Sequence, residues 1–280
     1  MIASDAVIGQ LPGHGLRGSG LQAAPQRGYL FLETRDRRTD GTSMQRHMEA
    51  RLVSQEQLFL YEELMLLALR DEKGTLEANE TKFVYTIAGA LVADLLLLKR
   101  IGVEEVRKKK IVNVLSEAPV GDPLLDECMA RFVSAKRRAS LKTWVSRFVS
   151  IKKLRHRVAL QLCRRGILRA DEDTVLLVFT RKIYPELDPR PERDLIERLR
   201  RAIFTDTGDV DPRTTVLISL AHRADVLNNV FDKKDLKLRK DRIDQICEGE
   251  MTGPAAQEVF EAMEAVMFAA VMMPAITSTS

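Results

Sequence analysis

The stretch LFLYEELMLLALR, residues 58–70, establishes the helical character of the chain. Just before it, Ser54 followed three residues later by Gln57 resembles a capping box, which marks the start of a helix. We therefore predict a strongly apolar helix over this stretch, ended near Gly74. From here outward, the sequence continues as one helix after another.

A second apolar run follows, and it predicts a helix over residues 82–99. Its apolar part, Phe83 to Leu98, is about one turn shorter than the ~20 residues that a membrane span needs, and it contains Asp94. A later run, Phe260 to Met273, is shorter still and contains two glutamates. Both runs therefore predict buried helices rather than membrane spans.

Caps and turn residues delimit the other elements. Asp122 has N-cap character and Pro123 suits the first helical position, so a helix is predicted to begin there. The segment Val175 to Phe179 is the clearest β signal and predicts a strand or one arm of a hairpin. Further helices are predicted over 139–149, 151–165, 191–204, 211–230, 233–248 and 254–273, and a short strand over 108–115. The predicted fold class is therefore mainly α.

Length and composition favour one main domain in a reducing compartment. The chain has 280 residues, of which 45% are hydrophobic, enough for one sizeable core. Residues 1–50 lack apolar periodicity and predict a disordered tail, followed by a helical domain over residues 51–275. The widely spaced Cys128, Cys163 and Cys247 predict free thiols, and the first residues do not resemble a secretion signal. We therefore expect a cytoplasmic protein.

The distribution of charge is the strongest anomaly of the sequence. The formal net charge is only +4, yet residues 131–170 contain thirteen Lys or Arg and no Asp or Glu. A solvated helical face normally mixes both signs. This block therefore indicates an anionic partner, with a purely solubilising basic surface as the alternative.

The predicted helix 151–165 carries its basic side chains on both sides of a core-facing stripe. At about 100 degrees per residue, four apolar side chains share that stripe: Ile151, Leu154, Val158 and Leu162. One flank is predicted to carry Lys152, Arg155 and His156, and the other to carry Lys153, Arg157 and Arg164. Nearby, Trp144 is predicted to be a core residue.

No motif in the sequence supports an enzyme. The four histidines are scattered, and none belongs to a metal-binding or catalytic pattern. Glu62 and Glu63 are adjacent and point in different directions on a helix, so they do not form a catalytic carboxylate pair. The sequence contains no nucleophile elbow, phosphate loop or dinucleotide fingerprint, and we expect no cofactor and no metal. A binding protein is therefore favoured over an enzyme.

Two kinds of anionic partner suit the basic block. Nucleic acid would attract it through phosphates, but only 5% of the residues are aromatic, so base stacking is poorly supplied. An anionic membrane would gain roughly 1 kcal/mol per Lys or Arg near its surface, and the apolar stretch VLLVF, residues 175–179, follows the basic helix closely. Membrane binding is favoured, and a nucleic-acid or acidic-protein binding module is the alternative.

Five segments resemble the Golgi phosphoprotein 3 family, in the same order and at similar spacing. They are LFLYEELMLLALRDEKGTL (58–76), YTIAGALVADLLLLKRI (85–101), APVGDPLLDECM (118–129), LRHRVALQLCRRGIL (154–168) and RTTVLISLAHRADVLNNVF (213–231). The resemblance covers about residues 54–273. It implies a compact single helical domain with a short projecting β-hairpin.

The resemblance also implies a ligand and a site. Eukaryotic members of the family are peripheral Golgi proteins that bind phosphatidylinositol 4-phosphate and the cytosolic tails of Golgi glycosyltransferases. Their headgroup pocket uses arginines on the helix that matches KKLRHR, which assigns the lipid headgroup to Lys152 and Arg155, with Arg157 close by. We therefore expect a peripheral membrane protein that binds anionic phospholipid headgroups.

The apolar hairpin of the family is linked to membrane insertion and to self-association. It matches Val175, Leu176, Leu177 and Phe179 here. The implied partners are thus an anionic phospholipid membrane, the cytosolic tails of membrane proteins and a second copy of the chain, with nucleic acid disfavoured. The implied location is cytoplasmic and peripherally membrane-associated, at the Golgi membrane in a eukaryote.

The chain departs from the eukaryotic pattern within the headgroup pocket. A pocket tryptophan and a further pocket arginine of those members correspond to about Asn79 and Ala88 here. A segment before the basic helix is also shorter, and the pattern is closer to the bacterial branch of the family. The resemblance therefore implies a general affinity for anionic lipid rather than the complete set of phosphoinositide headgroup contacts found in the eukaryotic members.

Overall fold

The structure is a computed structural model of the chain, and it describes residues 57–69, 80–106, 109–175, 179–206 and 208–250. Several predictions lie outside the described residues: the disordered tail 1–50, the cap at Ser54, the helix 254–273 and the roles of Asn79, Leu176 and Leu177. The helix end predicted near Gly74 comes too late, because α2 ends at Ala68.

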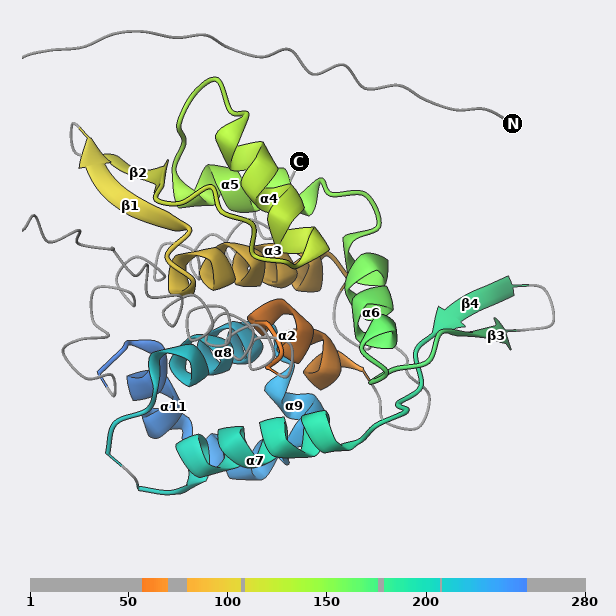
Figure 1. Ribbon diagram of the computed structural model, residues 1–280. Helices are drawn as coiled ribbons and strands as arrows, with labels where there is room; N and C mark the ends of the chain where they lie inside the picture. The colour runs from red at the N-terminus through yellow and green to blue at the C-terminus, as the bar shows by residue number, and fades with distance from the viewer. Residues whose placement is uncertain (1–56, 70–79, 107–108, 176–178, 207, 251–280) are drawn as a thin grey trace, which may run out of the picture. The chain divides into compact units, whose positions relative to one another are not determined.

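Helices make up most of the described chain (Figure 1). The helices are α2 (Leu60–Ala68), α3 (Glu80–Leu97), α4 (Pro123–Val133), α5 (Leu141–Val149), α6 (Leu154–Arg164), α7 (Arg190–Phe204), α8 (Pro212–Arg223), α9 (Leu227–Val230), α10 (Lys233–Leu238) and α11 (Lys240–Cys247). The strands are β1 (Ile101–Val106), β2 (Lys109–Val114), β3 (Asp171–Val175) and β4 (Phe179–Ile183). The predicted mainly α fold class is confirmed.

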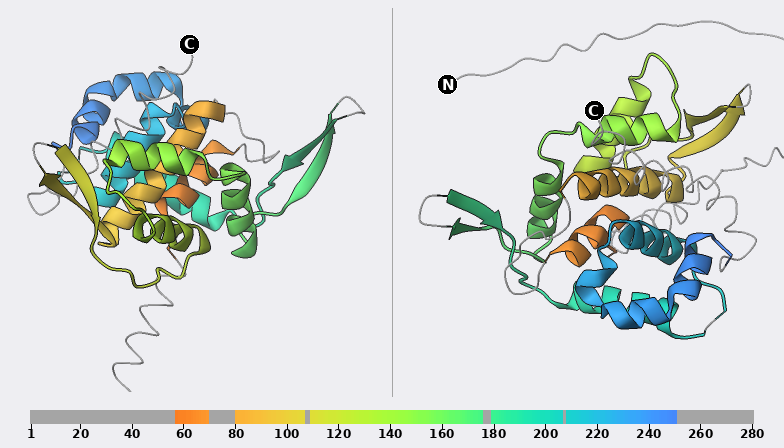
Figure 2. Two further views of the ribbon diagram at one scale, coloured as in Figure 1. Left: turned by 90° about the horizontal axis from the view of Figure 1, so that it is seen from above. Right: turned by 180° about the vertical axis from the view of Figure 1, so that it is seen from behind.

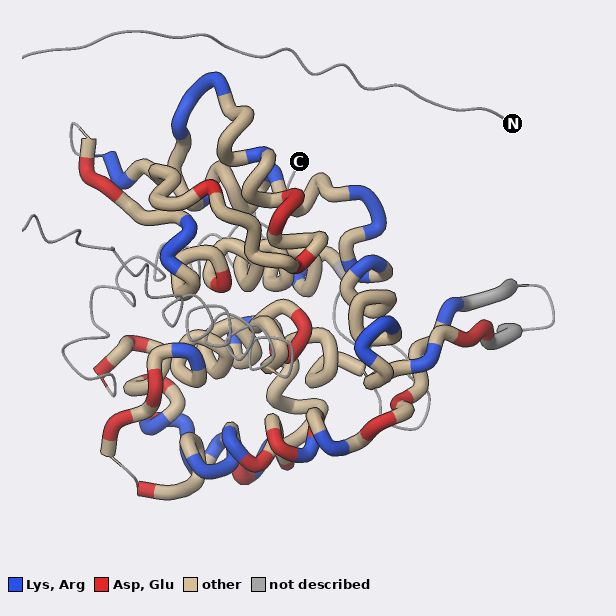
Figure 3. The backbone as a smooth tube through the Cα atoms, in the orientation of Figure 1, with Lys and Arg blue, Asp and Glu red and all other residues tan. Residues whose placement is uncertain are grey.

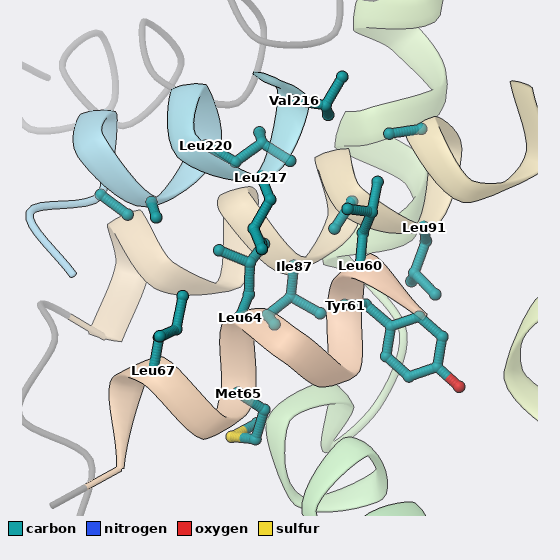
Figure 4. Packing of buried hydrophobic residues seen from close by; sticks show 14 of the residues in the cluster. Leu60, Tyr61, Leu64, Met65, Leu67, Ile87, Leu91, Val216, Leu217 and Leu220 are labelled. Atoms are coloured by element: carbon teal, nitrogen blue, oxygen red, sulfur yellow. The ribbon is translucent and has the colours of Figure 1, made fainter. Parts of the chain in front are cut away.

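Helix α2 lies in the core. All of its residues from Leu60 to Ala68 are buried, and it packs against α3, α6, α7, α8 and α9. Figure 4 shows side chains of α2, α3 and α8, among them Leu64, Ile87 and Leu217, converging between these helices. Apart from Glu62 and Glu63, which pair with arginines, the side chains of α2 are apolar around the helix, and such a helix is stable only where protein surrounds it. The stretch that predicts the helical fold is therefore also the one around which the helices assemble.

Helix α3 is the buried helix that its apolar run predicts. Leu91 is fully buried, and Asp94 is only 1% exposed. The Asp94 carboxylate accepts hydrogen bonds from the backbone N–H groups of Leu60 (3.0 Å) and Tyr61 (3.3 Å), so it satisfies donors at the start of α2. Within the described ranges, no helix combines the length and the apolar character needed to cross a membrane.

The predicted helix starts around α4 and α8 follow from their caps. The Asp122 carboxylate accepts hydrogen bonds from the N–H groups of Leu124 and Leu125, and Pro123 occupies the first helical position, as predicted. Asp211 caps α8 in the same way through the N–H of Thr214. These caps are local, which is why the sequence alone places them correctly.

Two predicted long helices are each divided in the structure. The predicted helix 211–230 ends at Arg223 and resumes as α9, with Asp225 between them at a positive φ of 61°. The predicted helix 233–248 is interrupted at Arg239, whose φ of −103° is not helical. Both sequences keep helical periodicity across the break, so the interruption could not be located from the pattern.

The strands form two antiparallel hairpins. Strand β1 pairs with β2 from Ile101↔Val114 to Val106↔Lys109, and only the second of these strands was predicted. Strand β1 was missed because Gly102 and its two glutamates dilute the β-branched pattern. Strands β3 and β4 pair from Asp171↔Ile183 to Val175↔Phe179 and extend away from the helices (Figures 1 and 2). The projecting hairpin is therefore confirmed, whereas the single strand or arm predicted over Val175 to Phe179 is wrong, because these two residues belong to opposite strands and pair with each other.

Candidate functional site: a basic cavity beside the β3–β4 hairpin

The candidate site begins at the turn that leads into α6. Ile151, Leu154, Val158 and Leu162 are all at most 3% exposed, which confirms the core-facing stripe. Lys153 immediately precedes the helix and has left-handed backbone angles, φ 56° and ψ 36°. Its side chain does not cap the helix, and the first turn contains no acidic residue. The positive end of the α6 dipole is thus accompanied by cations, an arrangement that an anion would stabilise.

A cavity of about 310 Å³ lies between this turn and the base of the β3–β4 hairpin. The residues that line it are Lys153, Arg155, His156, Lys182 and Tyr184. Figure 3 shows Lys and Arg gathered at the start of α6 and at the base of the hairpin. None of the described residues lining the cavity is acidic. Three cationic side chains from two elements therefore converge on one small space.

The side chains of His156 and Tyr184 join α6 to the strand side of the cavity through a hydrogen bond between Nδ1 and the phenolic oxygen. Burial, followed by the charges of Lys182 and Lys153, lowers the pKa of His156. Burial raises the pKa of Tyr184 and keeps its hydroxyl protonated. The pair is therefore neutral at neutral pH, with the hydroxyl able to donate to the imidazole.

The structure separates the predicted headgroup residues. Arg155 lines the cavity, whereas Lys152 is exposed on the adjoining turn. Arg157 faces α4, where its Nη2 lies 2.6 Å from Oε2 of Glu127. Arg131 contacts the same carboxylate at 2.8 Å, and these arginines lower the pKa of Glu127. Arg157 thus connects two helices and contributes no lining to the cavity.

Sequence reasoning missed two cationic members of the cavity. It placed Lys153 on the flank opposite Arg155, because helical angles were applied from residue 151 onward. The helix begins at Leu154, and the left-handed turn before it brings Lys153 to the same cavity as Arg155. Lys182 comes from β4; Glu172 lies opposite it in the strand register, yet no ion pair joins these two described residues.

The positions related to the rest of the family pocket and to the hairpin are only partly described. Ala88 is fully buried in α3, so this position offers no cation. Val175 and Phe179 end their strands and pair directly with each other, whereas Leu176 and Leu177 between them lie outside the described residues. Trp144, predicted as core, is confirmed at 2% exposed.

A second group of charges surrounds α2 and is internally compensated. Arg165 pairs with Glu62 at 2.6 Å, and Glu63 pairs with Arg198 at 2.9 Å and Arg213 at 3.2 Å. The two glutamates thus serve different arginines, in agreement with their predicted divergence. A larger cavity of about 750 Å³ borders this network, and two of its arginines, Arg190 and Arg198, pair with acids of the same lining. It is therefore a weaker candidate for an anion.

Chemically, the smaller cavity is equipped to bind rather than to react. Its cations can hold phosphate oxygens through charge-assisted hydrogen bonds. Across the described part of the chain, His, Cys, Asp and Glu side chains nowhere form a group of three or more that could hold a metal ion.

Comparisons with known proteins identify a similar protein in fission yeast and a matching protein family. It is 24% identical to vacuolar protein sorting-associated protein 74 of Schizosaccharomyces pombe, in an alignment that covers 69% of this chain. The alignment covers 66% of that relative, slightly less than two thirds of its length. A family model described as Golgi phosphoprotein 3 (GPP34) matches residues 60–264, which include the whole of the basic cavity. The chain therefore belongs to the Golgi phosphoprotein 3 family.

Proposed function

We propose that this protein is a peripheral membrane protein whose basic cavity beside the β3–β4 hairpin binds the phosphate of an anionic phospholipid headgroup. The observation that carries the proposal is the convergence of Lys153, Arg155 and Lys182 on one cavity without an acidic lining residue among the described ones. Membership of the Golgi phosphoprotein 3 family supports a membrane-associated role in general. The protein acts by binding, not by catalysis.

The electrostatic attraction is weak and additive. Each Lys or Arg near an anionic bilayer contributes roughly 1 kcal/mol, and salt screens the interaction within a Debye length of about 8–10 Å. Lys152, exposed on the adjoining turn, adds to the attraction outside the cavity. Arg157 acts indirectly, because its ion pair with Glu127 fixes α6 against α4. Such a site binds reversibly and needs a second contribution for stable attachment.

The β3–β4 hairpin supplies that second contribution. Its strands are paired as far as Val175 and Phe179, and we use the word tip for the apolar sequence positions Val175, Leu176, Leu177 and Phe179. Phe179 and Lys182 are three residues apart in β4, which spans about 10 Å at ~3.3 Å per residue. Interfacial segments bury their apolar side chains about 5–10 Å into the headgroup and acyl boundary. Binding of a phosphate in the cavity is thus compatible with insertion of the tip into the bilayer. The same apolar residues could instead pair with those of a second copy of the chain.

An adaptor role rests on the same attachment. The relative in fission yeast is named for vacuolar protein sorting, and a membrane-bound chain of this family would hold cytosolic tails of membrane proteins close to the bilayer. We propose such tails as partners, a second copy of the chain as a further one, and, in a eukaryote, the Golgi membrane as the location.

Vesicle sedimentation tests the headgroup site. The lipid series is phosphatidylcholine alone, phosphatidylcholine with phosphatidylserine, and phosphatidylcholine with phosphatidylinositol 4-phosphate at matched charge. We expect binding to both anionic mixtures and release by salt. Replacing Lys153 and Lys182 together by Gln should weaken binding at least about tenfold, since two contributions of roughly 1 kcal/mol are lost.

Two further variants complete that test. Lys152→Ala with Arg155→Ala examines the residues that the family resemblance selects, and a severalfold loss is expected. Lys233→Gln with Lys237→Gln on α10 is the charge-matched control, because both lysines are exposed and lie outside the cavity lining. Equal binding by the wild type and the Lys153 and Lys182 variant would exclude the cavity.

A nucleic-acid binding module is the second candidate, favoured only by the density of surface cations. The hairpin distinguishes the two functions, because insertion into lipid needs apolar side chains and tracking of phosphates does not. Leu177→Ser with Phe179→Ser should reduce vesicle binding and leave any binding to polynucleotide unchanged. The opposite pattern would favour nucleic acid.

A further inference from the structure

A second basic cleft lies where α4, α5 and the loop between them meet. Its volume is about 510 Å³. The residues that matter in its lining are Arg131, Lys136, Arg137, Trp144, Arg147 and Ser150. None of these residues lines the cavity beside the hairpin. In Figure 3 a run of Lys and Arg marks the loop between α4 and α5. Of the thirteen cations of the acid-free block, two line the cavity beside the hairpin and four line this cleft, so the block contributes to two separate hollows.

Most of the charge in this cleft is uncompensated. Arg131 pairs with Glu127 at 2.8 Å. Lys136 and Arg137 are exposed, and neither they nor Arg147 forms an ion pair with any described residue. Three cations therefore remain available to a ligand on the walls of one concave surface.

One of these cations is held in place by an aromatic ring. The guanidinium carbon of Arg147 lies 4.4 Å from the centre of the Trp144 ring, a cation–π contact. Phe132 and Phe148 pack against the same indole, with ring centres 4.0 and 5.8 Å away, so the ring is fixed from its other sides. The indole is 2% exposed, and its Nε1 has no hydrogen-bond acceptor among the described residues. The cleft thus contains a cation that an aromatic ring holds in place.

The negative C-terminal ends of α4 and α5 account for part of the positive charge in this cleft, but not for all of it. Helices α4 and α5 end next to Ser134 and Ser150, which both line the cleft. Each helix C-terminus carries a partial charge of roughly −0.5, so the two ends together amount to about one negative charge. Three uncompensated cations exceed that charge, and the cleft keeps a positive field.

We propose that this cleft is a second phosphate-binding site, which takes a phosphomonoester group independently of the cavity beside the hairpin. A phosphomonoester carries about −1.5 to −2 charges at pH 7 and three terminal oxygens, which matches three cations better than the single charge of a phosphodiester. The volume lies in the range of roughly 300–1,000 Å³ typical of small-ligand sites. The group can be borne by a lipid headgroup or by a soluble phosphate ester.

The single tryptophan of the chain reports on this site directly. Trp144 is the only tryptophan and it lines the cleft, so a phosphate that recruits Arg147 changes the surroundings of the fluorophore. The full-length protein is titrated with glycerol 3-phosphate as the soluble probe. Separate titrations use phosphatidylcholine vesicles that contain phosphatidic acid, a phosphomonoester lipid, or phosphatidylglycerol, a phosphodiester lipid, at equal mole fraction.

We expect a saturable change of Trp144 emission with a phosphomonoester, and a smaller one with phosphatidylglycerol. A response to glycerol 3-phosphate would identify the ligand of the cleft as a soluble phosphate ester. A response only to phosphatidic acid vesicles would identify it as a lipid headgroup. Either result supports the proposed site. Lys136→Gln with Arg137→Gln should weaken the response about tenfold. The pair lies in an exposed loop, and thermal melting verifies that the variant is folded.

Two control variants separate this site from the headgroup cavity. Lys153→Gln with Lys182→Gln should leave the glycerol 3-phosphate response of Trp144 unchanged. In phosphatidic acid titrations this variant should keep the emission change at saturating vesicle concentration even where the apparent vesicle affinity falls. Lys233→Gln with Lys237→Gln should change neither. Any of three results would overturn the proposal. The first is no saturable change with either phosphomonoester, and the second is an equal response in the wild type and the Lys136 and Arg137 variant. The third is a response to a single-stranded oligonucleotide that neither phosphomonoester reproduces.

Discussion

The charges around α2 and the charges around the start of α6 follow opposite rules. Around α2 the buried carboxylates of Glu62, Glu63 and Asp94 all face arginines. At the cavity beside the hairpin, Lys153 and Lys182 have no ion-pair partner among the described residues. A buried charge without a partner costs several kcal/mol, whereas an exposed cation is solvated at little cost. The difference teaches that uncompensated charge, not the densest ion-pair network, distinguishes the surface that we propose as the binding site.

Breaking the buried network should have the largest effect. Arg213 is 18% exposed in its side chain and contacts both Glu63 and Asp94. Arg213→Met leaves these carboxylates buried with fewer partners and should lower the free energy of unfolding by about 3 kcal/mol, measured by urea denaturation. The matched control is Arg138→Met, which removes an exposed pair with Glu104 and should cost less than about 1 kcal/mol. Equal losses in the two variants would contradict the comparison.

The second prediction concerns the pH dependence of stability. Burial raises the pKa of Asp94 from its ordinary value near 3.8 to about 7 and that of Glu62 to about 7, although nearby arginines oppose both shifts. The unfolded chain therefore loses these protons at lower pH than the folded protein does, so it binds fewer protons between about pH 4 and pH 7. Stability should accordingly fall as pH rises through this window, by an amount on the order of several kcal/mol at about 1.4 kcal/mol per pKa unit.

Asp94→Asn isolates the contribution of Asp94 to that slope. The asparagine oxygen can still accept a hydrogen bond at the start of α2, and Arg213 keeps its contact with Glu63. Unfolding by urea at several pH values should show a shallower decline in the variant than in the wild type. An unchanged slope would assign the pH dependence to other groups.

The third prediction sharpens the comparison at the surface. His156 has a lowered pKa and shares the cavity with Lys153, Arg155, Lys182 and Tyr184. A bound phosphate favours the protonated imidazole, so vesicle binding should strengthen as pH falls from about 8 to about 5. One added charge near the surface, worth roughly 1 kcal/mol, corresponds to about fivefold. His156→Gln should remove this dependence, as measured by sedimentation at each pH; persistence of the full dependence would exclude the histidine.

The smallest effect is expected from Arg157. Because its guanidinium is engaged with Glu127, Arg157→Gln should change vesicle binding less than Arg155→Gln does, and should destabilise the fold by less than about 1 kcal/mol. Parallel sedimentation and thermal melting of the two variants measure both quantities. A larger binding loss in the Arg157 variant would mean that this arginine leaves its ion pair to meet the lipid.

The fold could be predicted where its signals are local, and the site only in part. The cap at Asp122 and Pro123 and the stripe from Ile151 to Leu162 depend on neighbours a few residues away, and both predictions are confirmed. The interruption at Asp225 was missed because the periodicity continues across it. The partnership of Lys153 with Lys182 was missed because it depends on a left-handed turn and on where a distant hairpin returns.

By itself, the sequence determined the helical fold class, the core-facing stripe of α6 and the acid-free block, since periodicity, capping and composition are carried by adjacent residues. Only the tertiary structure decided which cations of that block are neutralised. Arg157 and Arg131 contact Glu127, whereas Lys153 at the start of α6 and Lys136 in the α4–α5 loop contact no described acid. The reason is physical: an ion pair depends on a distance of a few ångströms between elements, and that distance is fixed by how the helices pack around α2.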